Sequence, residues 1–120
     1  MRIALVLLVL ATSGVTRGQP ENVYTPGNGV SLPSVVKQVR AEYTQEARDR
    51  RIVGTVLLDA VVRSDGSVGD VSVARSLDTE YGLDREAVKA MKQWQFRPGM
   101  KDGKPVAVKI AVEMTFTLRD

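Results

Sequence analysis

The chain has 120 residues, of which 43% are hydrophobic and 26% charged, and this length and composition predict a single globular domain. It contains no cysteine and no histidine, which excludes disulfides, thiol nucleophiles, Ser-His-Asp triads and the common metal sites, so we expect no cofactor and no metal. The formal net charge is only +3 and the basic residues are interleaved with acidic ones, so we also expect no nucleic-acid partner.

The N-terminus has the pattern of a signal peptide. Arg2 precedes the apolar run 3–11, and small or polar residues follow that run. A helix that spans a bilayer needs about 20 apolar residues, so the short run predicts export without a stable membrane anchor. We expect residues 1–18 to form the signal peptide and to be cleaved off, and the sequence leaves open whether cleavage follows Ser13 or Gly18.

Between the signal and the first strand the local signals are weaker. Residues 19–31 contain prolines and glycines without apolar periodicity, which predicts a flexible leader before a domain over 32–120. The apolar spacing in 32–40 suits a helix, whereas Pro33 and the β-branched residues suit an extended segment, so its state stays open. A threonine of N-cap type followed by helix-forming residues predicts a short helix over 44–51.

A strand hairpin is predicted in the middle of the chain. Valine and leucine dominate residues 52–63, as in a strand that is buried on both faces. Asp65 and Gly66 predict a tight turn after it, because this dipeptide readily supplies positive φ angles. The return strand is 68–75, whose imperfect alternation indicates a bulge near Gly69.

The C-terminal part combines a helix with a long strand. Apolar residues in 83–94 form one stripe of a helix, with basic residues opposite. Asp84 is the expected N-cap of this helix, and Pro98 and Gly99 follow its end. Residues 106–118 then alternate between apolar and polar side chains, which predicts a long strand with one buried face.

Together these elements predict an α+β fold. A three-stranded antiparallel sheet has the strands in the order second, first, third, with the amphipathic helix and the short helix packed on one face. The first strand is central because it is apolar on both faces. The last strand, residues 106–118, then has an unpaired side about 44 Å long, whose backbone groups can pair with another extended chain. The alternative is that residues 32–40 cover this edge, or that the strand bends into solvent.

Short sequence anchors occur in a fixed order over residues 43–118, which is most of the exported chain. They are Tyr43 and Ala47; Gly54 and Val56; Asp65-Gly66 with Val68, Val71 and Val73; Ser76; LDREAVKAMKQWQFRP from Leu83 to Pro98; GKPV from Gly103 to Val106; and the terminal VEMTFTL. In this spacing the chain resembles the TonB C-terminal domain family, although Thr44 stands where the family usually has proline.

This resemblance implies a non-enzymatic binding module in the periplasm of a Gram-negative bacterium. Members of the family pair their last strand with the TonB box, a short extended peptide of TonB-dependent outer-membrane receptors. The resemblance therefore implies such a receptor as the partner and strand addition, or β-augmentation, as the mode of binding. The residues implied to bind the peptide are Val108, Lys109, Ile110, Ala111, Val112 and Glu113.

Two other classes of function are weighed against this one. A second copy of the chain could pair through the same edge, which would make a homodimer and a self-associating periplasmic protein without an energy-transducing role. A small hydrolase would need two carboxylates close together. The acidic residues are instead scattered over strands, turns and helix starts, where capping and solvation explain them, so we expect no enzyme activity.

Overall fold

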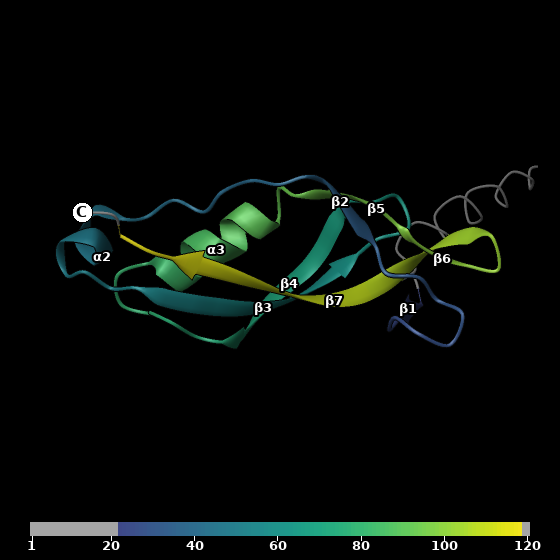
Figure 1. The fold of residues 1–120 in the computed structure, drawn as a ribbon, viewed down its shortest axis with the longest axis horizontal. Helices are drawn as coiled ribbons and strands as arrows, with labels where there is room; N and C mark the ends of the chain where they lie inside the picture. The colour runs from purple at the N-terminus through teal and green to yellow at the C-terminus, as the bar shows by residue number, and fades with distance from the viewer. Residues whose placement is uncertain (1–21, 119–120) are drawn as a thin grey trace, which may run out of the picture.

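Residues 22–118, the part of the chain that the computed structural model describes, form an α+β fold with two helices, a mixed main sheet and a small second sheet (Figure 1). The predicted signal peptide, residues 1–18, lies outside the described residues. The elements in chain order are β1 (Val23–Tyr24), β2 (Ser34–Lys37), α2 (Gln45–Asp49), β3 (Gly54–Val62), β4 (Val68–Arg75), α3 (Leu83–Met91), β5 (Gln95–Arg97), β6 (Gly99–Lys101) and β7 (Lys104–Phe116).

The main sheet has the strand order β1-β7-β3-β4, and β6 pairs with the start of β7. β3 pairs antiparallel with β4 on one side and with β7 on the other, so both neighbours predicted for the first long strand are present. The expected three-stranded, wholly antiparallel sheet is nevertheless wrong, because β6 adds a strand and β1 joins β7 in parallel. Strands of two or three residues are too short to show alternation in a sequence.

The segment predicted as a flexible leader, residues 19–31, belongs to the fold from residue 22 onward. β1 pairs with β7, and Val30 is buried. The backbone N–H of Ser31 donates a hydrogen bond to the carbonyl oxygen of Met100 at 3.0 Å. The described part of the leader therefore has a defined place against β6 and β7, which its own composition did not indicate.

Residues 32–40, whose state the sequence left open, are extended. β2 pairs antiparallel with β5 in the second sheet. An irregular segment then leads to α2, which starts after Thr44. The hydroxyl oxygen of Thr44 accepts a hydrogen bond from the backbone N–H of Ala47 at 3.2 Å, so Thr44 is the N-cap of the short helix.

The main helix, α3, has a different N-terminus from the one expected. Gly82 occupies the N-cap position with a φ of 95°, so the prediction of Asp84 as N-cap is wrong. The carboxylate of Asp84 instead accepts hydrogen bonds from the backbone N–H groups of Leu77 and Asp78, at 2.9 and 3.0 Å. Asp84 thereby ties the loop that joins β4 to α3 onto the helix.

The hairpin between β3 and β4 turns at the predicted dipeptide. The carboxylate of Asp65 accepts a hydrogen bond from the backbone N–H of Ser67 at 2.9 Å. Gly66 has a φ of 88°, and a Cβ atom at this position would collide with the carbonyl oxygen of Phe96. Only glycine fits both the backbone angle and the close approach of β5.

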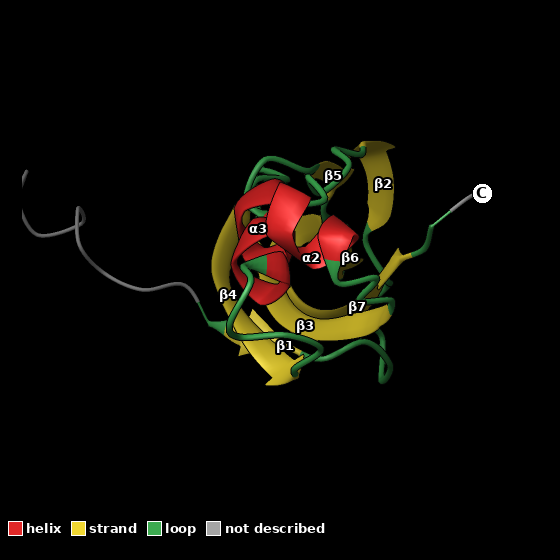
Figure 2. Ribbon diagram, turned by 90° about the vertical axis from the view of Figure 1, so that its left-hand side faces the viewer, coloured by secondary structure: helices red, strands yellow, loops and turns green. Residues whose placement is uncertain are grey.

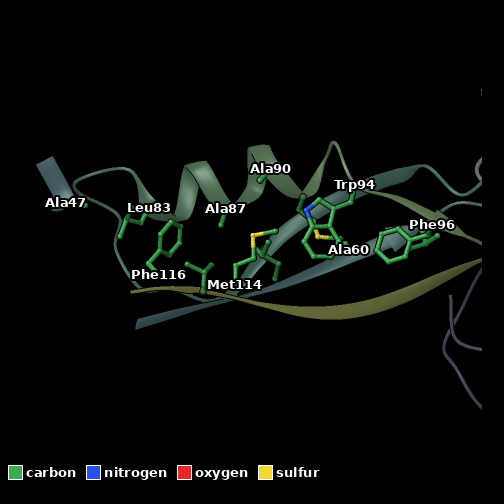
Figure 3. Close-up of a cluster of buried hydrophobic side chains, with 13 residues drawn as sticks. Ala47, Ala60, Leu83, Ala87, Ala90, Trp94, Phe96, Met114 and Phe116 are labelled. Carbon is green, nitrogen blue, oxygen red and sulfur yellow. The ribbon is translucent and has the colours of Figure 1, made fainter. Parts of the chain in front are cut away.

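The core lies between the main sheet and the helices. Figure 2 shows both helices on the concave face of the curved sheet. Leu83 and Met91 of α3 belong to the same hydrophobic cluster as Leu58 of β3, and all three are completely buried. Figure 3 shows Leu83 and Ala87 of α3 on the side of the helix that faces Met114 and Phe116 of β7. The rings of Trp94 and Phe96 stack with their centroids 6.1 Å apart beyond the end of α3. In the part of the chain that is described, neither helix has the length and apolar character needed to cross a bilayer.

Candidate functional site

One border of the main sheet is open along most of β7. On its inner side β7 pairs with β3 without a break from Val108 to Phe116. On its outer side β1 pairs only with Ala107 and Val108. From Lys109 to Phe116, no strand within residues 22–118 pairs with the outer side. We call this outer side the β7 edge, and it is about 27 Å long at the usual rise of a strand.

Five of the six residues expected to bind a partner peptide lie on the β7 edge, and the sixth does not. Val108 lies between Val62 of β3 and Tyr24 of β1 and is completely buried. The expectation of an open edge at Val108 is therefore corrected, because β1 already takes the place of an added strand there. The five residues on the edge are Lys109, Ile110, Ala111, Val112 and Glu113.

The side chains of the β7 edge alternate between two surfaces. Ile110 and Val112 are half-buried on the face that the helices cover. Lys109, Ala111 and Glu113 are exposed on the opposite face. A strand that is added to this edge would therefore meet apolar neighbours on one face and charged neighbours on the other.

A groove of about 1230 Å³ runs beside the last part of the β7 edge. Its second wall is the irregular segment between β2 and α2 (Figure 1), residues 38–43, which we call the strap. No backbone hydrogen bond joins the strap to β7 in the described structure, so this segment flanks the edge and does not cover it. The groove is lined by Gln38, Val39, Arg40, Ala41, Glu42, Tyr43, Arg48, Trp94, Glu113, Met114, Thr115, Phe116 and Thr117.

Aromatic side chains hold the strap at this distance from the sheet. The indole Nε1–H of Trp94 donates a hydrogen bond to the carbonyl oxygen of Val39 at 2.8 Å. The hydroxyl of Tyr43 donates to the carbonyl oxygen of Ile52, and its ring meets Phe116 edge to face with the centroids 5.5 Å apart. The strap is thus attached near both of its ends, and the ring contact between Tyr43 and Phe116 joins it to β7.

Between these two attachments the strap has free backbone groups. The backbone N–H groups of Arg40, Ala41 and Glu42 form no hydrogen bond with any described residue. Arg40 and Glu42 are exposed and Ala41 is half-buried. Donors and acceptors of the main chain are therefore available on both walls of the groove. The sequence offered residues 32–40 only as a cover for this edge, and it did not indicate that residues 38–43 form the second wall of a groove, because the strap is distant from β7 along the chain.

Asp78 forms the other notable polar cluster, in the loop before α3. It is buried, and its carboxylate accepts hydrogen bonds from the backbone N–H groups of Glu80, Tyr81 and Leu83, each at 3.0 Å. Burial alone would raise the pKa of Asp78, but these hydrogen bonds and the nearby charge of Arg85 outweigh it and lower the pKa from its ordinary value.

The acceptor capacity of this cluster is already used to shape the loop. The carboxylate of Asp84 likewise accepts hydrogen bonds from loop atoms, including the hydroxyl of Ser76. Within residues 22–118 no group of three or more acidic side chains is placed so that it could hold a metal ion. The two buried carboxylates therefore have a structural role, and the β7 edge with its groove is the better candidate for function.

Comparison with known proteins gives a consistent result. Residues 39–118 match the model of the family described as Gram-negative bacterial TonB protein C-terminal. Protein TonB of Vibrio cholerae is 38% identical over 90 residues, which are 74% of this chain and 36% of the relative. Protein tonB2 of Pseudomonas aeruginosa is 38% identical over 77 residues, which are 64% of this chain and 28% of the relative. The chain thus spans about a third of the length of these curated relatives.

A solved structure has the same fold. The solution NMR structure of the Pseudomonas aeruginosa TonB CTD superposes with a TM-score of 0.61 at 25% identity, and the match covers 85% of this chain and 98% of that one. The family match includes residues 39–43 of the strap and all of β7, which form the two walls of the groove. The chain belongs to the family of Gram-negative bacterial TonB protein C-terminal domains.

Proposed function

We propose that this chain is a binding module of TonB-dependent transport, whose β7 edge pairs with the TonB box of a TonB-dependent outer-membrane receptor. The observation that carries the proposal is the regular edge from Lys109 to Phe116, with which no strand of residues 22–118 pairs. Membership of the TonB C-terminal family supports the transport role. The open edge supports strand addition, in which main-chain hydrogen bonds supply affinity and alternate side chains supply specificity.

The groove supports an extended peptide as the occupant. Along the stretch of β7 from Glu113 to Phe116, the added strand would lie between β7 and the strap, with free backbone groups on both sides. Its inward side chains would contact the half-buried Ile110 and Val112. Its outward side chains would lie beside Lys109 and Glu113, where complementary charge sets the register.

The module is proposed to act in the periplasm, after export and cleavage of residues 1–18. Its backbone groups, apolar contacts and surface charges would hold the peptide, and the proposed binding involves no catalysis and no cofactor. Binding of the receptor peptide, as an adaptor or competitor, is the role we assign to it. Transmission of force is not part of the proposal.

A peptide titration tests the proposed function. A synthetic TonB-box peptide added to the 15N-labelled protein should shift the amide resonances of residues 109–116 and of the strap. The fluorescence of Trp94, the one tryptophan of the chain, should change in parallel, because its indole lies in the groove wall. Saturable shifts that map to β4 and leave residues 109–116 unchanged would contradict the proposal.

Two neighbouring proline variants make the test specific. Along an antiparallel strand, the N–H groups of successive residues point alternately to the two sides. Of Ala111→Pro and Val112→Pro, one therefore removes a donor that faces β3, and the other removes a donor that faces outward. The outward variant should keep its fold by circular dichroism and lose peptide binding, whereas the inward variant should be destabilised. Full peptide affinity in a folded outward variant would argue against strand addition.

A further inference from the structure

The second sheet is part of a longer two-stranded unit at the outside of the molecule. β2 pairs antiparallel with β5, and an isolated bridge joins Val30 to Lys101 in the register of that pairing. Residues 30–37 and 95–101 therefore run side by side, and we call them the ribbon. Figure 2 shows β2 at the periphery of the molecule, away from β3 and β4.

One face of the ribbon carries both apolar and basic side chains. Side chains alternate along a strand and paired residues share a face, so Leu32 lies on the same face as Ser34 and its partner Arg97. The bulge in β2 places Lys37 opposite Gln95, which is on that face as well. All five of these residues are exposed, and we call their side of the unit the outer face of the ribbon.

The apolar side chains in and around β2 are open to solvent. Leu32 is 67% exposed and Val36 is 60% exposed, the highest values among the large hydrophobic residues of the described chain. Val36 stands in the bulge next to Lys37, and Val35 beside it is also exposed. Single apolar residues are common on protein surfaces, whereas several together indicate a surface that binds something.

The charge of the ribbon has one sign. Residues 22–41 and 87–101, which include the whole ribbon, contain no aspartate or glutamate. Neither basic side chain of the outer face forms an ion pair with any residue of 22–118. Asp102 lies just past the end of the ribbon, where Lys101 pairs with it at 3.5 Å. The outer face is therefore cationic and apolar together, which complements an anionic lipid surface.

A lipid surface fits the outer face better than a protein partner does. Protein interfaces are enriched in aromatic residues and depleted in lysine. The outer face has a lysine and an arginine and carries no aromatic side chain among its five residues. At a bilayer, long basic side chains place their alkyl parts along the apolar layer and keep their charged groups near the phosphates.

We propose that the outer face of the ribbon is a docking site for a bilayer surface that contains anionic phospholipids. Leu32 and Val36 enter the boundary between headgroups and acyl chains, and Lys37 and Arg97 contact the phosphates. Such binding is reversible and needs no membrane-spanning helix. Because β2 continues directly into the strap, docking holds the peptide groove close to the membrane surface. The inference goes beyond the proposed function and does not depend on it.

Co-sedimentation with lipid vesicles tests the docking site. Residues 19–120 contain every described element and lack the apolar run 3–11, which could bind lipid by itself. This protein should sediment with vesicles of mixed phosphatidylglycerol and phosphatidylcholine and remain in solution with pure phosphatidylcholine. K37A/R97A should weaken binding to the mixed vesicles about tenfold through lost charge. L32S/V36S should weaken it about tenfold through lost apolar burial.

A matched control and a second measurement make the test specific. V53S/R75A removes one exposed valine and one exposed arginine outside the ribbon, and it should bind the vesicles like the wild type. Circular dichroism establishes that each variant is folded. In the 15N-labelled wild type, a spin-labelled phospholipid should broaden the amide resonances of residues 32–37 and 95–97 more than those of β4, which tests the site without any substitution.

Three results would overturn the docking site. The first is no binding to the mixed vesicles, as expected if the outer face serves an acidic protein. The second is unchanged binding of L32S/V36S, which would mean adhesion through charge alone. The third is broadening that is strongest at β4. No receptor peptide is present in these experiments, so a failed peptide titration would leave their result standing.

Discussion

The two strands that flank β3 in the main sheet, β4 and β7, differ in regularity. β4 pairs with β3 in a register that shifts twice, between Leu57 and Leu58 and again between Ala60 and Val62. β7 pairs with the same strand without any shift. Irregular pairing bends and twists an edge and hinders the addition of another strand, whereas a regular edge stays available for it.

Side chains reinforce this difference. Gly69 and Asp70 stand near the start of β4, where they weaken a strand and introduce charge. On β7 the charges of Lys109 and Glu113 lie on the exposed face, and apolar side chains occupy the other. The comparison teaches that the two strands beside one central strand can differ in function: irregular pairing hinders strand addition at β4, whereas regular pairing leaves β7 able to accept an added strand.

The largest loss of stability is expected from a change in β3, because this strand supports both β4 and β7. Leu58 of β3 is completely buried between the sheet and α3. We expect Leu58→Ala to lower the free energy of unfolding by about 3 kcal/mol, because it removes buried methyl groups and leaves a cavity. Urea denaturation measures the loss. Leu57→Ala, at a half-buried neighbour on the other face, is the matched control and should cost clearly less.

A medium effect should be confined to the β4 side. In Asp78→Asn, an amide NH2 group replaces the carboxylate oxygen that accepts the N–H of Leu83, or the side chain has to rotate to keep an oxygen there. Either change should lower the free energy of unfolding by about 2 kcal/mol. Peptide affinity at β7 should stay unchanged. Asp70→Asn, at an exposed position of β4, is the control and should leave stability nearly unaltered.

The same carboxylate predicts a pH dependence. The pKa of Asp78 is lowered in the folded protein from its ordinary value of 3.8. Its contribution to stability is therefore fully present above pH 3.8 and is lost as the pH falls through the lower folded pKa. Acid titration of the unfolding free energy should be less steep in Asp78→Asn. Equal steepness in both proteins would count against this assignment.

The smallest loss of stability should come from releasing the strap, and this change also tests whether peptide binding at β7 depends on the strap. Trp94→Phe keeps an aromatic ring but removes the hydrogen bond to Val39, which we expect to cost about 1 kcal/mol. Because the strap is released from one attachment, isothermal titration calorimetry should also show weaker peptide binding. Gln93→Ala removes an exposed hydrogen bond to Lys89 outside the groove and should leave binding intact.

Local sequence signals predicted the long elements well, because their side-chain patterns are set by short-range geometry. β4 has the predicted bounds 68–75, and α3 begins at the predicted Leu83. The alternation predicted over 106–118 corresponds to β7, shifted by two residues at each end. The N-cap of α3 was missed, because Asp84 has the right residue type for a cap but hydrogen-bonds to the preceding loop.

The candidate site was predicted only in part. Alternation identified β7, and strand composition placed it beside β3, so the stretch from Lys109 to Glu113 could be named from the sequence. The closure of the edge at Val108 and the strap beside Met114 and Phe116 could not. Both depend on segments that are close in space, distant along the chain and without a repeating pattern.

By itself, the sequence determined where the long strands, the hairpin and the main helix form, since periodicity and turn residues act over a few neighbours. It also determined which face of β7 is apolar. Only the tertiary structure decided how much of the β7 edge is open. The pairing of β1 and the hydrogen bond from Trp94 to Val39 join residues far apart in the chain, and such contacts become favourable only once the central sheet exists to receive them.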